Sequence, residues 1–180
     1  MKLLLHTCCV PCLIYPLERL QQKNFEVVGL FYNPNIHPLA EYEKRKKAVL
    51  DYAQGRDTEI IHPQYFPSEF FWAVNTKETS PERCFICWRL RLKKTAEIAR
   101  ENDYTHLSTT LLVSPYQNQE LLHKIGLDVA KEEGVEFYYE DFRPGFRQAH
   151  DQAKVQGIYC QNYCGCIYSE QERCKKSPKH

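Results

Sequence analysis

The chain has 180 residues, of which 43% are apolar and 26% are charged, and its net charge is +1. This size and balance are typical of a well-buried globular domain and exclude a largely disordered chain. No apolar run approaches the roughly 18–20 residues of a membrane span, and the leucine run at 3–5 is too short for a signal peptide. We therefore expect a cytoplasmic protein without a membrane partner, in which residues 1–180 form a single domain with a cysteine-rich tail at 159–180.

Predicted strands and helices alternate along the chain. A strand at 2–6, a helix at 13–23, a strand at 25–32, a helix at 39–54 and a strand at 58–63 come first. An aromatic, irregular stretch at 64–74 follows, and then a helix from Pro81 to about Asn102, capped by Ser80. The pattern ends with a strand at 104–110, a helix at 114–134, a strand at 135–140 and a helix around 145–155. Such alternation predicts an α/β fold with a doubly wound parallel sheet of about five strands.

Two polar segments are expected to face each other at one edge of this sheet. If the strand order is 3-2-1-4-5, the first and fourth strands are neighbours. HTCCVPC (6–12) follows the first strand, and STTLLVSPYQN (108–118) follows the fourth. Ligands bind beyond the carboxyl ends of the strands in such sheets, so the crevice between these segments is the predicted binding site.

Nine cysteines are unusual in a chain that we place in a reducing compartment. They form three clusters: Cys8, Cys9 and Cys12; Cys84 and Cys87; and Cys160, Cys164, Cys166 and Cys174. Clustered thiols in such a chain indicate metal ligands or redox groups rather than inert buried side chains.

The first two clusters together suit a metal group with four thiolate ligands. Cys84 and Cys87 lie three residues apart at the start of a predicted helix, on one face. With the adjacent Cys8 and Cys9 they provide the four thiolates of a [4Fe–4S] cluster, which leaves Cys12 as a spare thiol beside it. A zinc site is the alternative that the spacing leaves open.

The Cys-Gly-Cys sequence at 164–166 favours a different chemistry. Two cysteines separated by one glycine can close a strained, easily reduced disulfide, so Cys164 and Cys166 are candidate redox residues. A small zinc site formed by Cys160, Cys164, Cys166 and Cys174 is the alternative.

Clusters of charged and aromatic residues are the candidate features for binding RNA. Residues 83–100 carry six basic side chains against Glu97 alone, KRKK occupies 44–47, and residues 131–141 are acidic. The basic helix and the aromatic FFW at 70–72 are candidate RNA-binding surfaces, with core packing as the alternative for the aromatics. The alternative for the charged segments is that they are solvent-exposed faces of helices, as most such segments are. We expect structural roles for His6, His62, His106 and His123. Packing is the expected role of Tyr116 and Tyr163, with proton donation as the alternative.

Four segments together give the chain a family resemblance. HTCCVPC near the N-terminus, PERCFICWRLRL at 81–92, STTLLVSPYQN at 108–118 and YCQNYCGCIYS at 159–169 resemble the QueH family of epoxyqueuosine reductases. The resemblance covers nearly the whole chain in order and spacing. Members are similar to the PP-loop group, which has a HUP-like, Rossmann-like fold. HTCCVPC replaces the phosphate loop of that group, so no use of ATP is expected.

The resemblance implies an enzyme that reduces epoxyqueuosine to queuosine in tRNA, the last step of queuosine biosynthesis. It implies a [4Fe–4S] cluster on Cys8, Cys9, Cys84 and Cys87, an additional iron ion with Cys12 as candidate ligand, and a redox-active Cys164–Cys166 pair. An external electron donor would regenerate that pair. Two other functions stay open: a zinc-stabilised RNA-binding module, and a PP-loop-like tRNA sulfur transferase.

Overall fold

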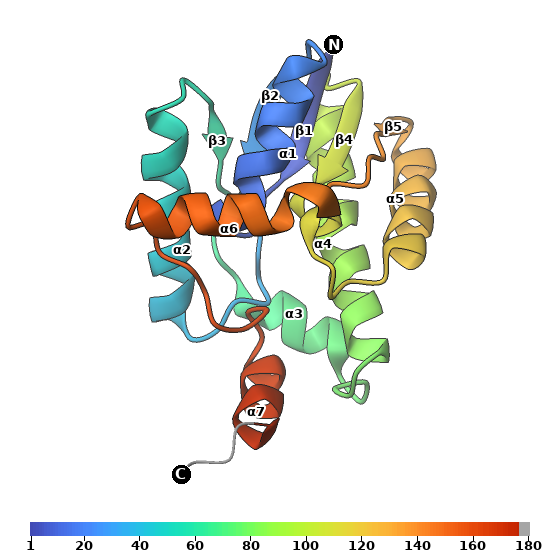
Figure 1. Cartoon of the computed structure of the whole chain (residues 1–180). Helices are drawn as coiled ribbons and strands as arrows, with labels where there is room; N and C mark the ends of the chain where they lie inside the picture. Colours follow the sequence, from blue (N-terminus) through green and yellow to red (C-terminus); the bar gives the residue numbers. More distant parts are fainter. Residues whose placement is uncertain (177–180) are drawn as a thin grey trace.

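A five-stranded, all-parallel sheet lies at the centre of the computed structural model, which describes residues 1–176 (Figure 1). Its strands are β1 (Lys2–His6), β2 (Glu26–Leu30), β3 (Ile60–Ile61), β4 (His106–Thr109) and β5 (Glu136–Phe137). Their order in the sheet is β3-β2-β1-β4-β5. The predicted α/β class, the parallel sheet and the strand order 3-2-1-4-5 are confirmed.

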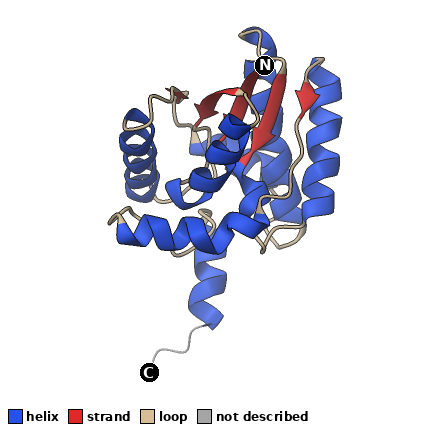
Figure 2. Ribbon diagram, turned by 45° about the horizontal axis from the view of Figure 1, so that its top comes forward, coloured by secondary structure: helices blue, strands red, loops and turns tan. Residues whose placement is uncertain are grey.

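Helices surround the sheet on both faces. They are α1 (Val10–Gln22), α2 (Leu39–Gln54), α3 (Pro67–Val74), α4 (Glu82–Glu101), α5 (Gln119–Glu133), α6 (Phe146–Val155) and α7 (Ile167–Lys176), with short 3₁₀ turns η1 (Thr110–Val113) and η2 (Arg143–Gly145). Helix α6 crosses α1, and α7 extends away from the body of the molecule (Figures 1 and 2).

The central strand β1 packs on both of its faces, as the alternation of side chains along a strand requires. Leu3 and Leu5 belong to the larger core cluster, which includes Leu17 of α1. Leu4 packs on the other face with Ala99 of α4. All of these side chains are buried, which explains why β1 is a continuous apolar run.

The carboxyl ends of β1, β2 and β4 meet at one edge of the sheet. The backbone N–H of Thr7 donates to the carbonyl of Leu30 at 2.8 Å, and the Asn33 side-chain amide donates to the Thr7 carbonyl at 2.9 Å. On the other side, His6 Nδ1 and Thr109 Oγ1 lie 2.9 Å apart. These bonds fix the segments that follow the three strands against one another, at the predicted crevice.

One stretch that we expected to be irregular is helical. Residues 64–74 contain α3, which begins at Pro67, a residue that fits the first turn of a helix. Phe70 and Val74, four residues apart, are both buried against α4. Burial of this aliphatic and aromatic stripe stabilises a helix where the density of aromatic residues had suggested none.

Three helix starts also differ from the prediction. Helix α1 begins at Val10 rather than 13. Pro81, not Ser80, precedes α4, and no side chain caps this end. Helix α5 begins at Gln119 instead of 114, because the Asn118 side chain accepts a hydrogen bond from the Leu121 N–H at 3.0 Å and so caps the helix.

The predicted tail is partly helical, since it contains α7. Its last four residues, 177–180, lie outside the described residues. Within residues 1–176, no helix combines the length and apolar character that crossing a membrane requires.

Candidate functional site

Three thiols gather where β1 ends and α1 begins. Cys8 and Cys9 follow the strand, Cys9 occupies the N-cap position of α1, and Cys12 lies in the first turn. The Sγ atoms of all three lie within 4.8 Å of one another, and those of Cys8 and Cys9 are 3.6 Å apart. The side chains are buried. Three buried soft donors at this spacing form a group that can hold a metal.

The three thiols are not equivalent. Hydrogen bonds from the thiols of Cys12 and Cys9 lower the pKa of Cys8 well below its usual value. Burial raises the pKa of Cys9, and the hydrogen bond to Cys8 raises the pKa of Cys12. The amide of Gln161 also donates to Cys9 Sγ at 2.8 Å. Of the three thiols, Cys8 is therefore the one whose surroundings favour the thiolate.

The second cysteine pair lies at the start of α4, as predicted. Cys84 is half-buried, with its thiol 3.8 Å from the Ser80 hydroxyl. Cys87 is buried beside Cys166, and burial raises the pKa of Cys87 to about 12. Neither joins the compact group of Cys8, Cys9 and Cys12. The structure thus brings the first cluster together and places the second outside it, so ligation by all four predicted cysteines stays a prediction.

A buried arginine lies among these thiols. Arg91 of α4 is 1% exposed. Its Nε donates to the Cys87 carbonyl at 3.4 Å and its Nη1 donates to Asn33 Oδ1 at 3.4 Å, and neither acceptor is a carboxylate. In the described part of the chain, its Nη2 has no hydrogen-bond partner. A guanidinium buried in this way is costly without a negative partner.

Charges on the neighbouring thiols affect this guanidinium. Burial lowers the pKa of Arg91, but the negative charge that Cys87, Cys164 and Cys8 can carry outweighs burial, so its pKa is raised. Arg91 therefore marks the place where the three cysteine clusters approach one another.

The Cys-Gly-Cys loop is held by its backbone. Arg45 of α2, also buried, donates from Nη1 to the Cys164 carbonyl at 3.0 Å and from Nη2 to the Tyr163 carbonyl at 3.1 Å. The His37 N–H donates to the Gly165 carbonyl at 2.9 Å, and the Tyr163 hydroxyl donates to the His37 carbonyl. The loop is therefore fixed against the segment that follows β2.

Glycine is required at the centre of this loop. Gly165 has a φ of +144°, a region that other residues rarely adopt. A Cβ atom there would also lie 3.0 Å from Ile36 Cγ1 and 3.1 Å from Asn35 Nδ2. The two cysteines beside it have different surroundings: Cys164 is exposed, and Cys166 is buried among Phe70, Val74 and Cys87.

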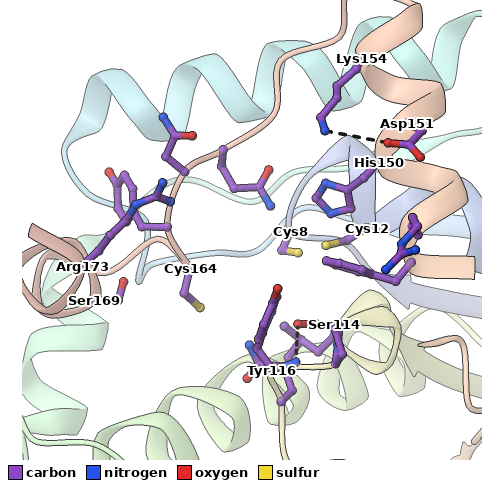
Figure 3. Close-up of a pocket in the computed structure, with 18 of the residues that line it drawn as sticks. Cys8, Cys12, Ser114, Tyr116, His150, Asp151, Lys154, Cys164, Ser169 and Arg173 are labelled. Carbon is purple, nitrogen blue, oxygen red and sulfur yellow. Dashed lines mark hydrogen bonds and ion pairs between the residues drawn. The ribbon is translucent and has the colours of Figure 1, made fainter. Parts of the chain in front are cut away.

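One cavity of about 1020 Å³ brings the first and third cysteine clusters together. Figure 3 shows Cys8 and Cys12 on one side of this space, Cys164 on another, and Tyr116 reaching in from a third. Its lining also includes Arg91, Phe146, Arg147, His150, Lys154, Gln161, Ser169 and Arg173. We refer to it as the main cavity. Its lining therefore combines thiols, cations and aromatic rings.

A known family model matches almost the whole chain. The model is that of epoxyqueuosine reductase QueH, and the match covers residues 3–172. The chain belongs to the epoxyqueuosine reductase QueH family.

Several curated relatives support this assignment. The epoxyqueuosine reductase QueH of Dehalococcoides mccartyi is 38% identical over 96% of this chain and 94% of its own length. The protein of the same name from Thermotoga maritima is 36% identical over 96% and 92%. That from Streptococcus pyogenes serotype M1 is 33% identical over 93% and 70%. The predicted QueH family and its class of enzyme, an oxidoreductase, are confirmed.

Most of the positive charge predicted on α4 is buried or paired, and RNA binding by this helix stays a prediction. Arg91 is buried, and so is Arg83, which pairs with Glu172 of α7 at 2.9 Å. Other cations of the helix have carboxylate partners: Arg89 with Glu132, Lys94 with Glu97, and Arg100 with Glu133. The helix therefore does not present six free positive charges to a partner.

The structure agrees with some of the roles expected for aromatic and histidine side chains and differs from others. Phe70 is buried, as core packing predicts, but Trp72 is 75% exposed. His6 is structural, since burial lowers its pKa to about 3 and it bonds Thr109. Tyr116 is not a packing residue, because it is 84% exposed at the mouth of the main cavity.

The tail cysteines do not gather into a metal site in the part of the chain that the structure describes. Cys164 and Cys174 are exposed, Cys166 is buried, and Cys160 donates toward the Ile158 carbonyl at 3.5 Å. Within residues 1–176, only Cys8, Cys9 and Cys12 form a group of three or more potential ligands at metal-binding spacing.

Sequence reasoning missed the buried arginines Arg45 and Arg91. Helical spacing could have identified both. Tyr42, Arg45, Val49 and Tyr52 lie on the buried stripe of α2, and Trp88, Arg91, Thr95 and Ala99 lie on that of α4. An arginine on an apolar stripe needs a buried polar partner, and it therefore indicates a site.

Proposed function

We propose that this chain reduces epoxyqueuosine to queuosine in tRNA, with a metal group on its cysteines and with Cys164 and Cys166 as the redox pair. Membership of the QueH family supports the reaction. The main support from the structure is one observation: the thiols of Cys8, Cys12 and Cys164 line a single cavity. A substrate in this cavity can contact the metal-binding and redox cysteines together.

The residues fit an anionic iron–sulfur group. Cys8, Cys9, Cys84 and Cys87 are the proposed ligands of a [4Fe–4S] cluster, and Cys12 is the proposed ligand of an additional iron. Thiolates are the ligands such groups prefer, and a cluster with four of them is negative overall. Arg91, buried without a carboxylate partner, provides the compensating positive charge. When bound, the group supplies electrons and a Lewis acid.

Oxidation of the two proposed redox cysteines supplies the electrons and protons that the reaction consumes. Removing the epoxide oxygen leaves an alkene and water, and it consumes two electrons and two protons. Oxidation of the Cys164 and Cys166 thiols to a disulfide releases two electrons and two protons. One dithiol therefore supports one turnover, and an external electron donor must then reduce the disulfide.

The mouth of the main cavity suits a base that is turned out of an RNA loop. Tyr116 is exposed there and lies edge to face with Phe146, with 5.9 Å between the ring centroids. Arg147, Lys154 and Arg173 also line the cavity. Aromatic rings stack on single-stranded bases and cations bind the adjoining phosphates, which favours an anticodon-loop substrate.

A single metal ion on the compact triad is the second candidate. The 3.6 Å between Cys8 Sγ and Cys9 Sγ is near the roughly 3.8 Å expected between thiolates on one tetrahedral zinc, for which Zn–S is about 2.3 Å. This spacing favours the alternative of a zinc-stabilised RNA-binding protein.

Metal analysis of protein purified without oxygen tests the proposal. We expect iron and inorganic sulfide in nearly equal amounts, a brown protein, and conversion of epoxyqueuosine in tRNA once a reductant is added. A colourless protein that contains only zinc and does not convert the tRNA would support the second candidate instead.

Replacing Arg91 by methionine should affect the metal-loaded protein but not the metal-free one. Without metal, the buried charge has no partner, so Arg91→Met should leave the melting temperature unchanged or raise it. With metal, the variant should melt several degrees lower than the parent, since about 1 kcal/mol corresponds to roughly 2–4 °C for a chain of this size. Thermal unfolding of both forms measures this.

Two further variants complete the Arg91 experiment. Arg91→Lys keeps the charge and should recover part of the difference. Arg89→Met, on the same helix but at the surface and paired with Glu132, should leave both forms unaffected. If Arg91→Met lowers the melting temperature of the two forms equally, Arg91 has only a packing role.

A further inference from the structure

A second cavity, of about 490 Å³, lies between α2 and the segment that follows α6. Its lining includes Lys44, Lys47, Asp51, Tyr52 and Arg56 on one side, and Gln156 and Tyr159 on the other. It is separate from the cysteines, and neither the family assignment nor the reaction proposed above requires it.

Two cations of this cavity lie on aromatic rings rather than on carboxylates. Lys44 Nζ is 3.9 Å from the centroid of the Tyr159 ring, and the Arg56 guanidinium carbon is 3.6 Å from that of Tyr52. Of the three lining cations only Lys47 forms an ion pair, with Asp51, in the described chain. The positive charge of Lys44 and Arg56 is therefore free to bind an anion.

Tyr52, whose side chain lines the same cavity, carries a buried hydroxyl without a partner within residues 1–176. Tyr52 is 5% exposed, and in the part of the chain that the structure describes its hydroxyl makes no hydrogen bond. Leaving such a group unpaired is unfavourable. Burial raises the pKa of Tyr52 to about 12, so the phenol stays protonated.

The two cavities are adjacent along the chain. Lys154, in α6, lines the main cavity, and Gln156, just after α6, lines the second. Likewise Tyr159 lines the second cavity, and Gln161 lines the main one. The segment between Lys154 and Gln161 therefore contributes to the walls of both cavities.

We propose that the second cavity binds a backbone phosphate of the substrate tRNA, near the nucleotide whose base enters the main cavity. This inference rests on the proposed function, and it adds a binding site for the RNA backbone to the site for the base. Lys44 and Arg56 contact the phosphate oxygens. The site thereby holds the anticodon loop in register with the thiols.

Binding of an anticodon stem-loop RNA tests the site without depending on activity. We expect Lys44→Ala to weaken binding about tenfold, the usual size for one charged contact. It should also reduce the slope of log affinity against log salt by about 1. Lys124→Ala is the matched control, because Lys124 is exposed on α5, at the opposite edge of the sheet (Figure 1). It should change neither quantity.

Replacing one phosphate at a time by a neutral linkage identifies the phosphate that the second cavity binds. Stem-loops that carry a single methylphosphonate are compared at each position beside the modified nucleoside. At one position, the neutral linkage should weaken binding to the parent but cause no further loss in Lys44→Ala. Losses that add in full at every position would overturn the proposal.

Two other outcomes would also overturn it. One is an unchanged salt slope in Lys44→Ala. The other is binding of inorganic phosphate that depends on Lys44 while RNA affinity does not, which would indicate a site for a free anion. A parent protein that binds the stem-loop but does not reduce epoxyqueuosine would instead contradict the proposed reaction, and the binding site would stand.

Discussion

Replacing Cys8 by serine is expected to remove most of the bound metal and to abolish reduction of epoxyqueuosine. Cys8 is the thiol of the triad whose pKa is lowered, it contacts Cys9 and Thr110, and it lines the main cavity. A serine hydroxyl stays protonated and is a poor ligand for iron or zinc. Changes next to a metal ligand already cost roughly 10–100-fold in metal affinity, so loss of the ligand itself should cost at least that. Iron, sulfide and zinc contents measure the effect.

Two cysteine variants make the Cys8 result specific. Cys160→Ser is the control, because this thiol is half-buried outside the triad and should leave the metal content unchanged. Cys84→Ser, measured in parallel, should lower cluster content and activity together. Full iron and sulfide in Cys8→Ser would contradict the proposed site, and full content in Cys84→Ser would remove Cys84 from the ligand set.

Replacing Cys164 by serine should leave the metal in place and stop repeated turnover. Cys164 lines the main cavity but is outside the group formed by Cys8, Cys9 and Cys12. Without it, Cys166 has no partner for a disulfide, so only electrons already stored in the protein reach the substrate. We expect at most about one product per protein, against many for the parent, counted in reactions with excess tRNA and excess reductant.

Cys166→Ser should behave in the same way, and it should also lower the stability because this side chain is buried. Cys174→Ser is the control, since this exposed thiol on α7 should be dispensable. The redox role is wrong if both Cys164→Ser and Cys166→Ser convert epoxyqueuosine tRNA at the parent rate over many turnovers. If either variant instead loses its metal, the tail contributes to the metal site.

Much of the fold follows from local sequence patterns. The apolar run at 2–6 and the β-branched residues at 26–30 form the two central strands at or close to their predicted bounds. β3 and β5 are only two residues long, and their predicted ranges were wider, since pairing at the edge of the sheet decides where they end. Helix α3 was missed because burial of Phe70, a tertiary effect, stabilises it.

The site was predictable only where its residues are close in sequence. Cys8, Cys9 and Cys12 occupy one turn, so their meeting follows from spacing alone. The contacts of Arg45 with Cys164 and of Gln161 with Cys9 join residues more than 100 positions apart, and no periodic pattern indicates such pairs. The tertiary fold brings these residues together, and it likewise forms the main cavity.

The unequal surroundings of Cys164 and Cys166 would give the proposed redox pair a direction. A disulfide is reduced when a thiolate attacks one of its sulfurs and the other leaves. Cys164 opens onto the main cavity, whereas Cys166 is enclosed by Phe70 and Val74. If the electron donor is a thiol, it would therefore approach the sulfur of Cys164 and not that of Cys166. The mixed disulfide would then form on Cys164 with Cys166 as the leaving group, and on the proposed function the donor would have to leave the cavity before the next tRNA could enter.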